Sequence, residues 1–185
     1  MAVVTCLGII VADAIAKPVE AIPDKGKLNL VDQLELHIGG CASNAGIALA
    51  KMGIDTNVIG KIGKDGFGDF VFHVLKKAGL GVEGIRRTED CGTSATVVLV
   101  SKDGERTFLH YTGANGEFVE DDVDYSIIEK SEILFIAGSL LMPKFDGEPT
   151  ARVLKRAKEM GIYTVLDNAW DSTGRWMSAI GPCLP

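Results

Sequence analysis

Apolar residues follow two different patterns along this chain, and each pattern predicts a different kind of β-strand. Some segments are almost continuously apolar, as expected of parallel strands that helices cover on both faces. Others alternate between apolar and polar side chains, which is typical of a sheet with one wetter face. The continuous segments lie at residues 3–11, 133–137 and 163–166, and the alternating ones at 28–38, 93–101 and 106–111.

Helical patterns separate the continuously apolar strands. Residues 42–52 form a small-residue helix that Gly53 closes, and a strand near residues 56–59 follows. Asp103-Gly104 predicts the turn of a hairpin that joins the two later alternating segments. The order is that of an α/β protein with a small sheet projecting from its main body. Further helices are predicted at residues 67–78, 121–130, 148–160 and 173–180.

Length and composition support one domain over residues 1–185, because the chain is too short for two domains of ordinary size. Apolar residues make up 46% of it and 22 residues are Gly, which suits many tight turns between strands and helices. The net charge of -6, without a Lys and Arg cluster, argues against nucleic-acid binding. No apolar run approaches the roughly 18 residues of a membrane span.

The four cysteines are widely spaced, with no Cys-x-x-Cys pair and no nearby pair of histidines. This spacing indicates neither a zinc site nor a redox motif. They resemble reduced cytosolic thiols, and we expect a cytoplasmic protein. His37, His73 and His110 are too scattered to define a metal site or a catalytic triad, and we predict no metal ligands.

One stretch of the chain carries the strongest chemical signal. A double glycine lets the backbone approach a ligand closely, and here it leads into a helix whose first N–H groups lack partners. Asn44, in the first turn, has an amide that donates and accepts, which suits a sugar hydroxyl better than a metal. The stretch reads Gly39-Gly40-Cys41-Ala42-Ser43-Asn44, then the helix, then Gly60-Lys61-Ile62-Gly63-Lys64-Asp65-Gly66-Phe67-Gly68.

Two carboxylates follow predicted central strands. Asp13 and Asp167 are expected at the carboxyl ends of strands, where ligands gather in open α/β sheets. The Asp13 carboxylate is suited to accept two hydrogen bonds from neighbouring hydroxyls and so orient a substrate. The competing interpretation is a structural cap, which the glycine motif makes less favourable.

The glycine-rich stretch closely resembles the first signature of the ribokinase-like (PfkB) carbohydrate kinases, and the resemblance extends over essentially the whole chain. It implies a three-layer α/β/α fold with a mostly parallel central sheet. It also implies a β-sheet lid, formed by segments at about 14–38 and 93–111, which closes over the substrate and serves as a dimer surface. In this family the sugar is bound by residues that match Asp13, Gly39, Gly40 and Asn44.

The resemblance implies roles for other residues as well. Phe108 or Thr96 of the second lid region would cover the sugar, although plain packing within the lid is an equal alternative. Asn168 corresponds to a place near the nucleotide phosphates, with turn formation as the alternative. Asp65 is interpreted as a helix cap, and Trp176 as a packed anchor of the last helix.

A dinucleotide-binding fingerprint is also present, but its context is wrong. Gly79-Leu80-Gly81-Val82-Glu83-Gly84 follows a predicted helix and precedes a strand, the reverse of a phosphate-binding turn. We interpret these glycines as a helix stop and a loop. The Gly-x-x-x-x-Gly-Lys-Ser/Thr motif of P-loop enzymes is absent from the sequence.

Phosphoryl transfer to a hydroxyl needs a base and groups that neutralise the charge of the transferred phosphoryl. The family supplies these from a Gly-Ala-Gly-Asp-like segment and an Asn-x-x-Glu segment, neither of which occurs here. We therefore predict no catalytic residues in this chain and expect them after Pro185, with ATP and Mg²⁺ as cofactors of the full-length enzyme. The chain alone is expected to be inactive.

Two functions are compatible with this pattern. The favoured one is the N-terminal, substrate-binding part of an ATP-dependent sugar kinase, acting as a homodimer on an unphosphorylated sugar. The alternative is a complete, non-catalytic module that binds a sugar or a nucleoside. Lys61 and Lys64 offer positive charge for a sugar phosphate, but solvated loop lysines are the commoner case.

Overall fold

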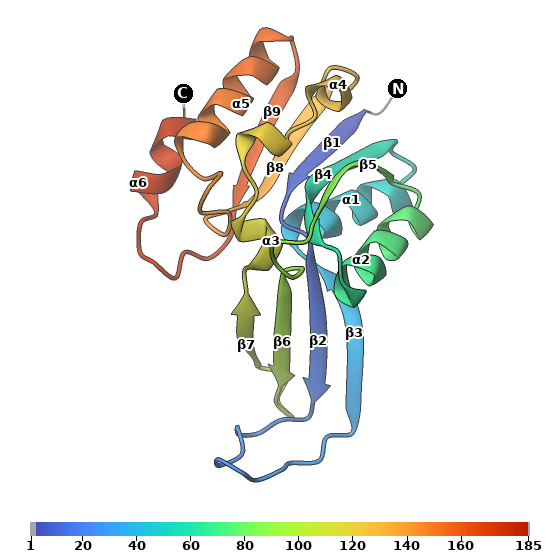
Figure 1. The fold of residues 1–185 in the computed structure, drawn as a ribbon, viewed down its shortest axis with the longest axis vertical. Coiled ribbons are helices and arrows are strands. Elements are labelled where there is room, and N and C mark those ends of the chain that lie inside the picture. Colours follow the sequence, from blue (N-terminus) through green and yellow to red (C-terminus); the bar gives the residue numbers. More distant parts are fainter. Residues whose placement is uncertain (1–2, 185) are drawn as a thin grey trace.

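The protein is described over residues 3–184 by a computed structural model, and its centre is a five-stranded sheet whose strands all run parallel. The strand order is β5-β4-β1-β8-β9, so that β1 lies in the middle and is paired on both sides (Figure 1). The strands are β1 (Val4–Gly8), β4 (Thr56–Gly63), β5 (Gly81–Thr88), β8 (Ile133–Ser139) and β9 (Tyr163–Asn168).

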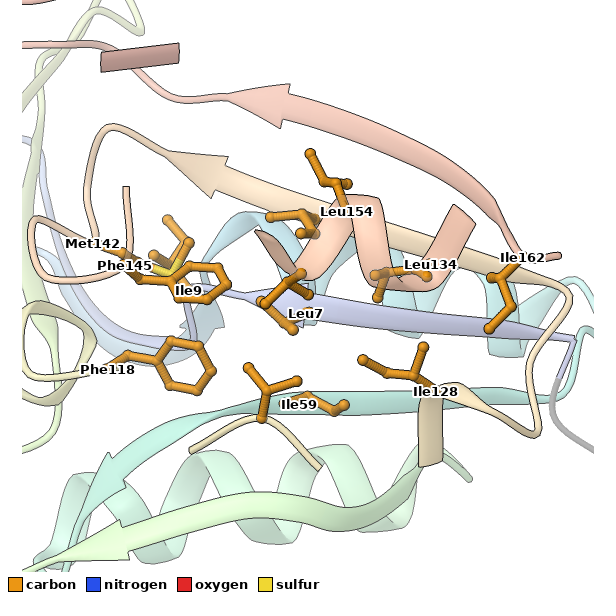
Figure 2. Close-up of a cluster of buried hydrophobic side chains, with 14 of the residues drawn as sticks. Leu7, Ile9, Ile59, Phe118, Ile128, Leu134, Met142, Phe145, Leu154 and Ile162 are labelled. Atoms are coloured by element: carbon orange, nitrogen blue, oxygen red, sulfur yellow. The ribbon is translucent and has the colours of Figure 1, made fainter. Parts of the chain in front are cut away.

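Helices cover both faces of this sheet, which confirms the predicted three-layer α/β/α class. Successive side chains of β1 point to opposite faces. Cys6 packs in a cluster with Ala42 of α1, whereas Leu7 packs in another cluster with Leu154 of α5 (Figure 2). One face carries α1 (Cys41–Lys51) and α2 (Gly66–Lys77), and the other carries α4 (Tyr125–Ile128) and α5 (Glu148–Glu159).

A second sheet of four strands projects from the carboxyl end of the central sheet (Figure 1). Its order is β3-β2-β6-β7; the β2–β6 pair is parallel and the other two pairs are antiparallel. The predicted hairpin is confirmed as the β6–β7 pair. We call this sheet the lid. It consists of β2 (Val11–Lys17), β3 (Gln33–Gly39), β6 (Ala95–Val100) and β7 (Arg106–Tyr111).

The apolar segment at residues 3–11 is not the single strand that its pattern predicts. β1 ends at Gly8, the chain crosses at Ile9 and Ile10, and β2 of the lid begins at Val11. Asn115 holds the crossing: the Ile10 amide donates to its Oδ1 at 3.2 Å, and its Nδ2 donates to the Ile10 carbonyl at 3.0 Å. The crossing is buried against both sheets, so apolarity does not reveal it.

The segment between β7 and β8 also differs from the prediction, which placed one helix at residues 121–130. It contains a short 3₁₀ turn and then α4, which begins after Asp124 because the Asp124 carboxylate accepts from the Ser126 amide at 3.0 Å. The fingerprint glycines are likewise only partly as predicted: Gly79 follows α2, but Gly81 and Gly84 lie inside β5. The other short elements between β7 and β8 are α3 (Gly113–Gly116) and the 3₁₀ turn Glu120–Asp122.

The C-terminal elements are shorter and more exposed than predicted. β9 is not a buried strand, since Tyr163 is 78% exposed at the edge of the sheet. The helix predicted from residue 173 begins only at Met177, because Asp171 accepts hydrogen bonds from the Thr173 and Trp176 amides and holds the chain in a turn. In the lid, the alternating strand predicted at residues 28–38 is also shorter than predicted, because β3 starts at Gln33. The last elements are α6 (Met177–Ile180) and the 3₁₀ turn Gly181–Cys183.

Candidate functional site

The candidate site is a cleft between the carboxyl end of the central sheet and one face of the lid. A smaller inner pocket of about 200 Å³ reaches Asp13 and the start of α1. A larger outer pocket of about 600 Å³ adjoins it and extends towards Trp170. The two pockets share Thr96, Phe108, His110 and Leu141, so they form one continuous cleft.

Asp13 reaches this cleft from a different element than predicted. It does not follow a strand of the central sheet; it lies within β2 of the lid, in register with Thr96 of β6 and His37 of β3. It nevertheless lines the inner pocket together with Asn44 of α1. Its carboxylate accepts no hydrogen bond from residues 3–184, so both oxygens are available to a ligand.

The double glycine brings the backbone close to Asp13. A β-carbon added to Gly39 would lie 2.0 Å from Asp13 Oδ2. A β-carbon on Gly40 would lie 2.4 Å from the Ile9 carbonyl oxygen. Gly40 also has a φ of +94°, a backbone conformation that residues other than Gly rarely adopt. The turn therefore has no room for a side chain at residue 39 or at residue 40.

Ser43 stabilises this turn, a role that the sequence analysis did not assign. Its buried hydroxyl donates to the Gly39 carbonyl and lies 3.0 Å from the Gly40 carbonyl oxygen. A serine that bonds a carbonyl three or four residues earlier is a recurrent pattern in helices, so its spacing from the glycines was the available signal.

Asn44 presents its side chain to the inner pocket. The helix holds its backbone, because the Asn44 amide donates to the Gly40 carbonyl at 2.9 Å. Its side chain is exposed and makes no hydrogen bond with residues 3–184. The amide group can therefore both donate to and accept from a ligand hydroxyl.

Strands β6 and β7 of the lid contribute three further side chains to the cleft. Phe108 is 53% exposed and lines both pockets, and the predicted contact residue Thr96 lies beside it. Thr96 Oγ1 lies 3.1 Å from His110 Nδ1. The lid strands desolvate the His110 ring and lower its pKa, although the ring stays exposed to the cleft; the Asp13 carboxylate acts in the opposite direction.

Of the three histidines, His110 lines the cleft, whereas His37 and His73 line neither pocket. His37 instead pairs with Glu35 on the lid, its Nε2 2.8 Å from the Glu35 carboxylate. Sequence spacing does not place His110 in the cleft. Its position follows from the register of β7 with β6, which sets His110 opposite Thr96.

Asp65 is confirmed as the cap of α2 and does not line the cleft. The Gly68 amide and the Thr93 hydroxyl donate to its Oδ1, each at 2.7 Å, and the Thr93 amide donates to its Oδ2 at 2.7 Å. Burial raises the pKa of Asp65, but these hydrogen bonds outweigh it and leave the pKa lowered. The motif residue thus ties the β4–α2 loop to the start of β6.

The two other predicted residues stand apart from the inner pocket. Asn168 ends β9 and is exposed, while its neighbour Ala169 lines the pocket. Its nucleotide-side role stays a prediction. Trp176 is not a packed anchor within a helix: it is 37% exposed before α6 and makes an edge contact with Trp170, with ring centroids 5.4 Å apart.

The described residues 3–184 include no group of three His, Cys, Asp or Glu side chains placed to hold a metal ion. The four cysteines are unpaired thiols. Within the same range, no helix combines the length and the apolar character needed to cross a bilayer.

Known proteins share both the sequence pattern and the fold. The profile of the pfkB family carbohydrate kinases matches residues 1–183. The chain is 27% identical over 153 residues to probable fructokinase-5 of Arabidopsis thaliana, covering 80% of this chain and 47% of that protein. It is 28% identical over 134 residues to 5-dehydro-2-deoxygluconokinase of Clostridium perfringens, covering 71% and 40%. Fructokinase with bound ATP from Xylella fastidiosa superposes with a TM-score of 0.81 at 24% identity, over 98% of this chain and 57% of that one.

A parallel sheet with a projecting β-lid, and a glycine turn beneath the lid, define a ribokinase-like fold. The chain belongs to the PfkB family of carbohydrate kinases. It spans less than half the length of the two curated relatives described above.

Proposed function

We propose that this chain forms the substrate-binding part of an ATP-dependent sugar kinase. The observation that carries the proposal is the inner pocket, where the Asp13 carboxylate and the Asn44 amide both lack partners among residues 3–184. Two polar groups without partners, beside a backbone turn that leaves no room for side chains, suit a ligand rich in hydroxyls.

The proposed role of these residues is to hold the sugar rather than to react with it. Asp13 accepts hydrogen bonds from two hydroxyls, and Asn44 adds a donor and an acceptor from the start of α1. Gly39 and Gly40 allow the sugar to approach the backbone. Phe108 of the lid covers the apolar face of the sugar and helps to exclude water, which would otherwise compete as the phosphoryl acceptor.

The phosphoryl-transfer groups are proposed to lie in another part of the same domain. The match covers only 47% of probable fructokinase-5, and neither the Gly-Ala-Gly-Asp-like segment nor the Asn-x-x-Glu segment occurs in this chain. ATP supplies the transferred phosphoryl group. We propose Mg²⁺ as the second cofactor of the full-length enzyme; residues 3–184 include no group of side chains placed to hold it. Asn168 is the residue we propose to face the nucleotide.

A homodimer through the lid is the assembly that we propose. The lid face opposite the cleft carries exposed apolar side chains aligned by the strand register, for example Val97 opposite Leu109. Contiguous exposed apolar surface of this kind marks interaction sites. We call this surface the outer lid face; its exposed members are Leu34, Leu36, Val97, Leu109 and Tyr111.

Calorimetric titration with D-fructose and D-ribose, beside an ADP-release assay with ATP and Mg²⁺, tests the function. Asp13→Asn is expected to abolish sugar binding, whereas Asp32→Asn, an exposed site in the loop between β2 and β3, is expected to leave it intact. Sugar-dependent ADP release supports the kinase. Because residues 1–185 lack the predicted phosphoryl-transfer segments, sugar binding without ADP release is expected of this chain under either function; the same result with the full-length protein would indicate the non-catalytic module. Unchanged binding by Asp13→Asn would overturn the assignment of the pocket.

A further inference from the structure

Three polar side chains form a row across the cleft face of the lid. Asp13 of β2 is in register with Thr96 of β6, and Thr96 is in register with His110 of β7. Residues directly opposite one another on paired strands point to the same face of a sheet. All three line the inner pocket, so the row faces the place proposed for the sugar.

Thr96 fixes the His110 ring and leaves one of its nitrogens unused. Thr96 is only 8% exposed, and its hydroxyl oxygen lies 3.1 Å from His110 Nδ1. In a neutral imidazole one nitrogen is a donor and the other an acceptor, so Nε2 takes the role opposite to that of Nδ1, and the Thr96 hydroxyl can pair with Nδ1 in either role. His110 Nε2 has no hydrogen-bond partner among residues 3–184, while the ring is exposed to the cleft.

The surroundings of His110 favour a hydroxyl as the missing partner. The residues that line the two pockets include the Asp13 carboxylate but no Lys or Arg. Arg106, the nearest basic residue on β7, lies over the Phe108 ring, with its guanidinium carbon 5.7 Å from the ring centroid. An anionic substituent beside the row would meet Asp13 without a counter-charge, whereas a hydroxyl can bond His110 in either tautomer.

We propose that His110 is a specificity-determining residue whose Nε2 hydrogen-bonds one hydroxyl of the bound sugar, and that Thr96 is the positioning residue that orients its ring. This assignment rests on the proposed sugar-binding function and adds to it the means by which one hydroxyl is selected. Two residues of this row, Asp13 and His110, thereby hydrogen-bond the sugar from the lid.

The test compares D-fructose with its single-deoxy analogues in calorimetric titrations of the wild type, His110→Leu and Thr96→Val. His110→Leu is expected to weaken D-fructose binding about tenfold, the scale of one hydrogen bond in a desolvated site. For the one analogue that lacks the hydroxyl read by His110, wild type and His110→Leu should bind equally. Thr96→Val should weaken D-fructose binding by a smaller factor, and should add nothing in the double variant.

Other results would overturn the inference. Equal weakening of every analogue by His110→Leu would mean that the residue only supports the lid. His110→Gln, which restores a polar end, guards against misfolding and should recover most of the affinity. If Asp13→Asn abolishes binding while His110→Leu does not change it, the inference fails and the proposed function stands. If the wild type binds neither D-fructose nor D-ribose, both fail.

Discussion

Gly39 and Asp13 are packed so closely that no β-carbon fits between them: one built on Gly39 would lie 2.0 Å from Asp13 Oδ2. Asp13 thus lies against the bare backbone of the glycine turn, on the neighbouring strand of the lid. The position of the carboxylate is set by the absence of a side chain at residue 39 as much as by its own strand.

Gly39→Ala is therefore expected to displace the Asp13 carboxylate and to weaken sugar binding about tenfold or more, since a hydrogen bond to a charged group is lost. Calorimetric titration with D-fructose measures the change. Gly66→Ala is the matched control, because a β-carbon there meets nothing within 4 Å. Equal affinity in the Gly39→Ala protein and the wild type would contradict the role given to Asp13.

Asn115 should control the stability of the crossing between the two sheets. It is 1% exposed and exchanges two hydrogen bonds with the Ile10 backbone. Asn115→Ala leaves a buried N–H and a buried carbonyl without partners, and we expect it to lower the free energy of unfolding by about 3 kcal/mol. Urea denaturation measures this loss. Asn29→Ala removes a single hydrogen bond in an exposed loop and should cost less than about 0.5 kcal/mol.

Asp65 should make stability depend on pH in a defined direction. Its pKa is lowered in the folded state, so its stabilising effect is present above about pH 4, the unfolded value, and is lost as the pH falls through the folded pKa. Asp65→Asn should therefore cost about 1 kcal/mol at pH 7, the scale of a weakened helix cap. The difference from the wild type should shrink towards pH 3.

Urea midpoints measured between pH 3 and pH 7 test this pattern. Asp32→Asn, an exposed loop site, serves as the control and should follow the wild type throughout. A constant difference between Asp65→Asn and the wild type across the range would show that the Asp65 charge is not what stabilises the cap.

The outer lid face should govern self-association. Leu109 is 55% exposed there, and a charge in its place would have to be desolvated in a contact between two outer lid faces. Leu109→Lys is expected to shift the protein from dimer to monomer in light scattering. Met52→Lys, at an exposed apolar site at the end of α1, should not. A wild type that is monomeric at every concentration would refute the proposed dimer.

Local patterns predicted much of the fold. The α1 helix after the double glycine, α5 and the hairpin at Asp103-Gly104 are set by neighbouring residues, and all three are confirmed. The split of the first strand was not predictable in this way, because Ile9 and Ile10 are buried by different clusters and both are simply apolar. Periodicity records burial but not which sheet a strand joins.

The candidate site was predicted to a similar extent. Asn44 and the glycines lie together in sequence, so a local motif reveals them. His110 enters the site only through the pairing of β7 with β6 and of β6 with β2, a tertiary relationship that one sequence does not disclose. Asp13 was predicted to follow a strand of the central sheet, but it lies within β2 of the lid and lines the inner pocket from there.

That assignment changes how binding would work. With Asp13 on the lid and Asn44 on the main body, a sugar held by both forms a bridge between two separately built sheets. The affinity for the sugar would then depend on the distance between the two sheets. A movement of the lid away from the main body would weaken the Asp13 and Asn44 contacts together. Capture and release of the sugar would thus both depend on the spacing of the two sheets.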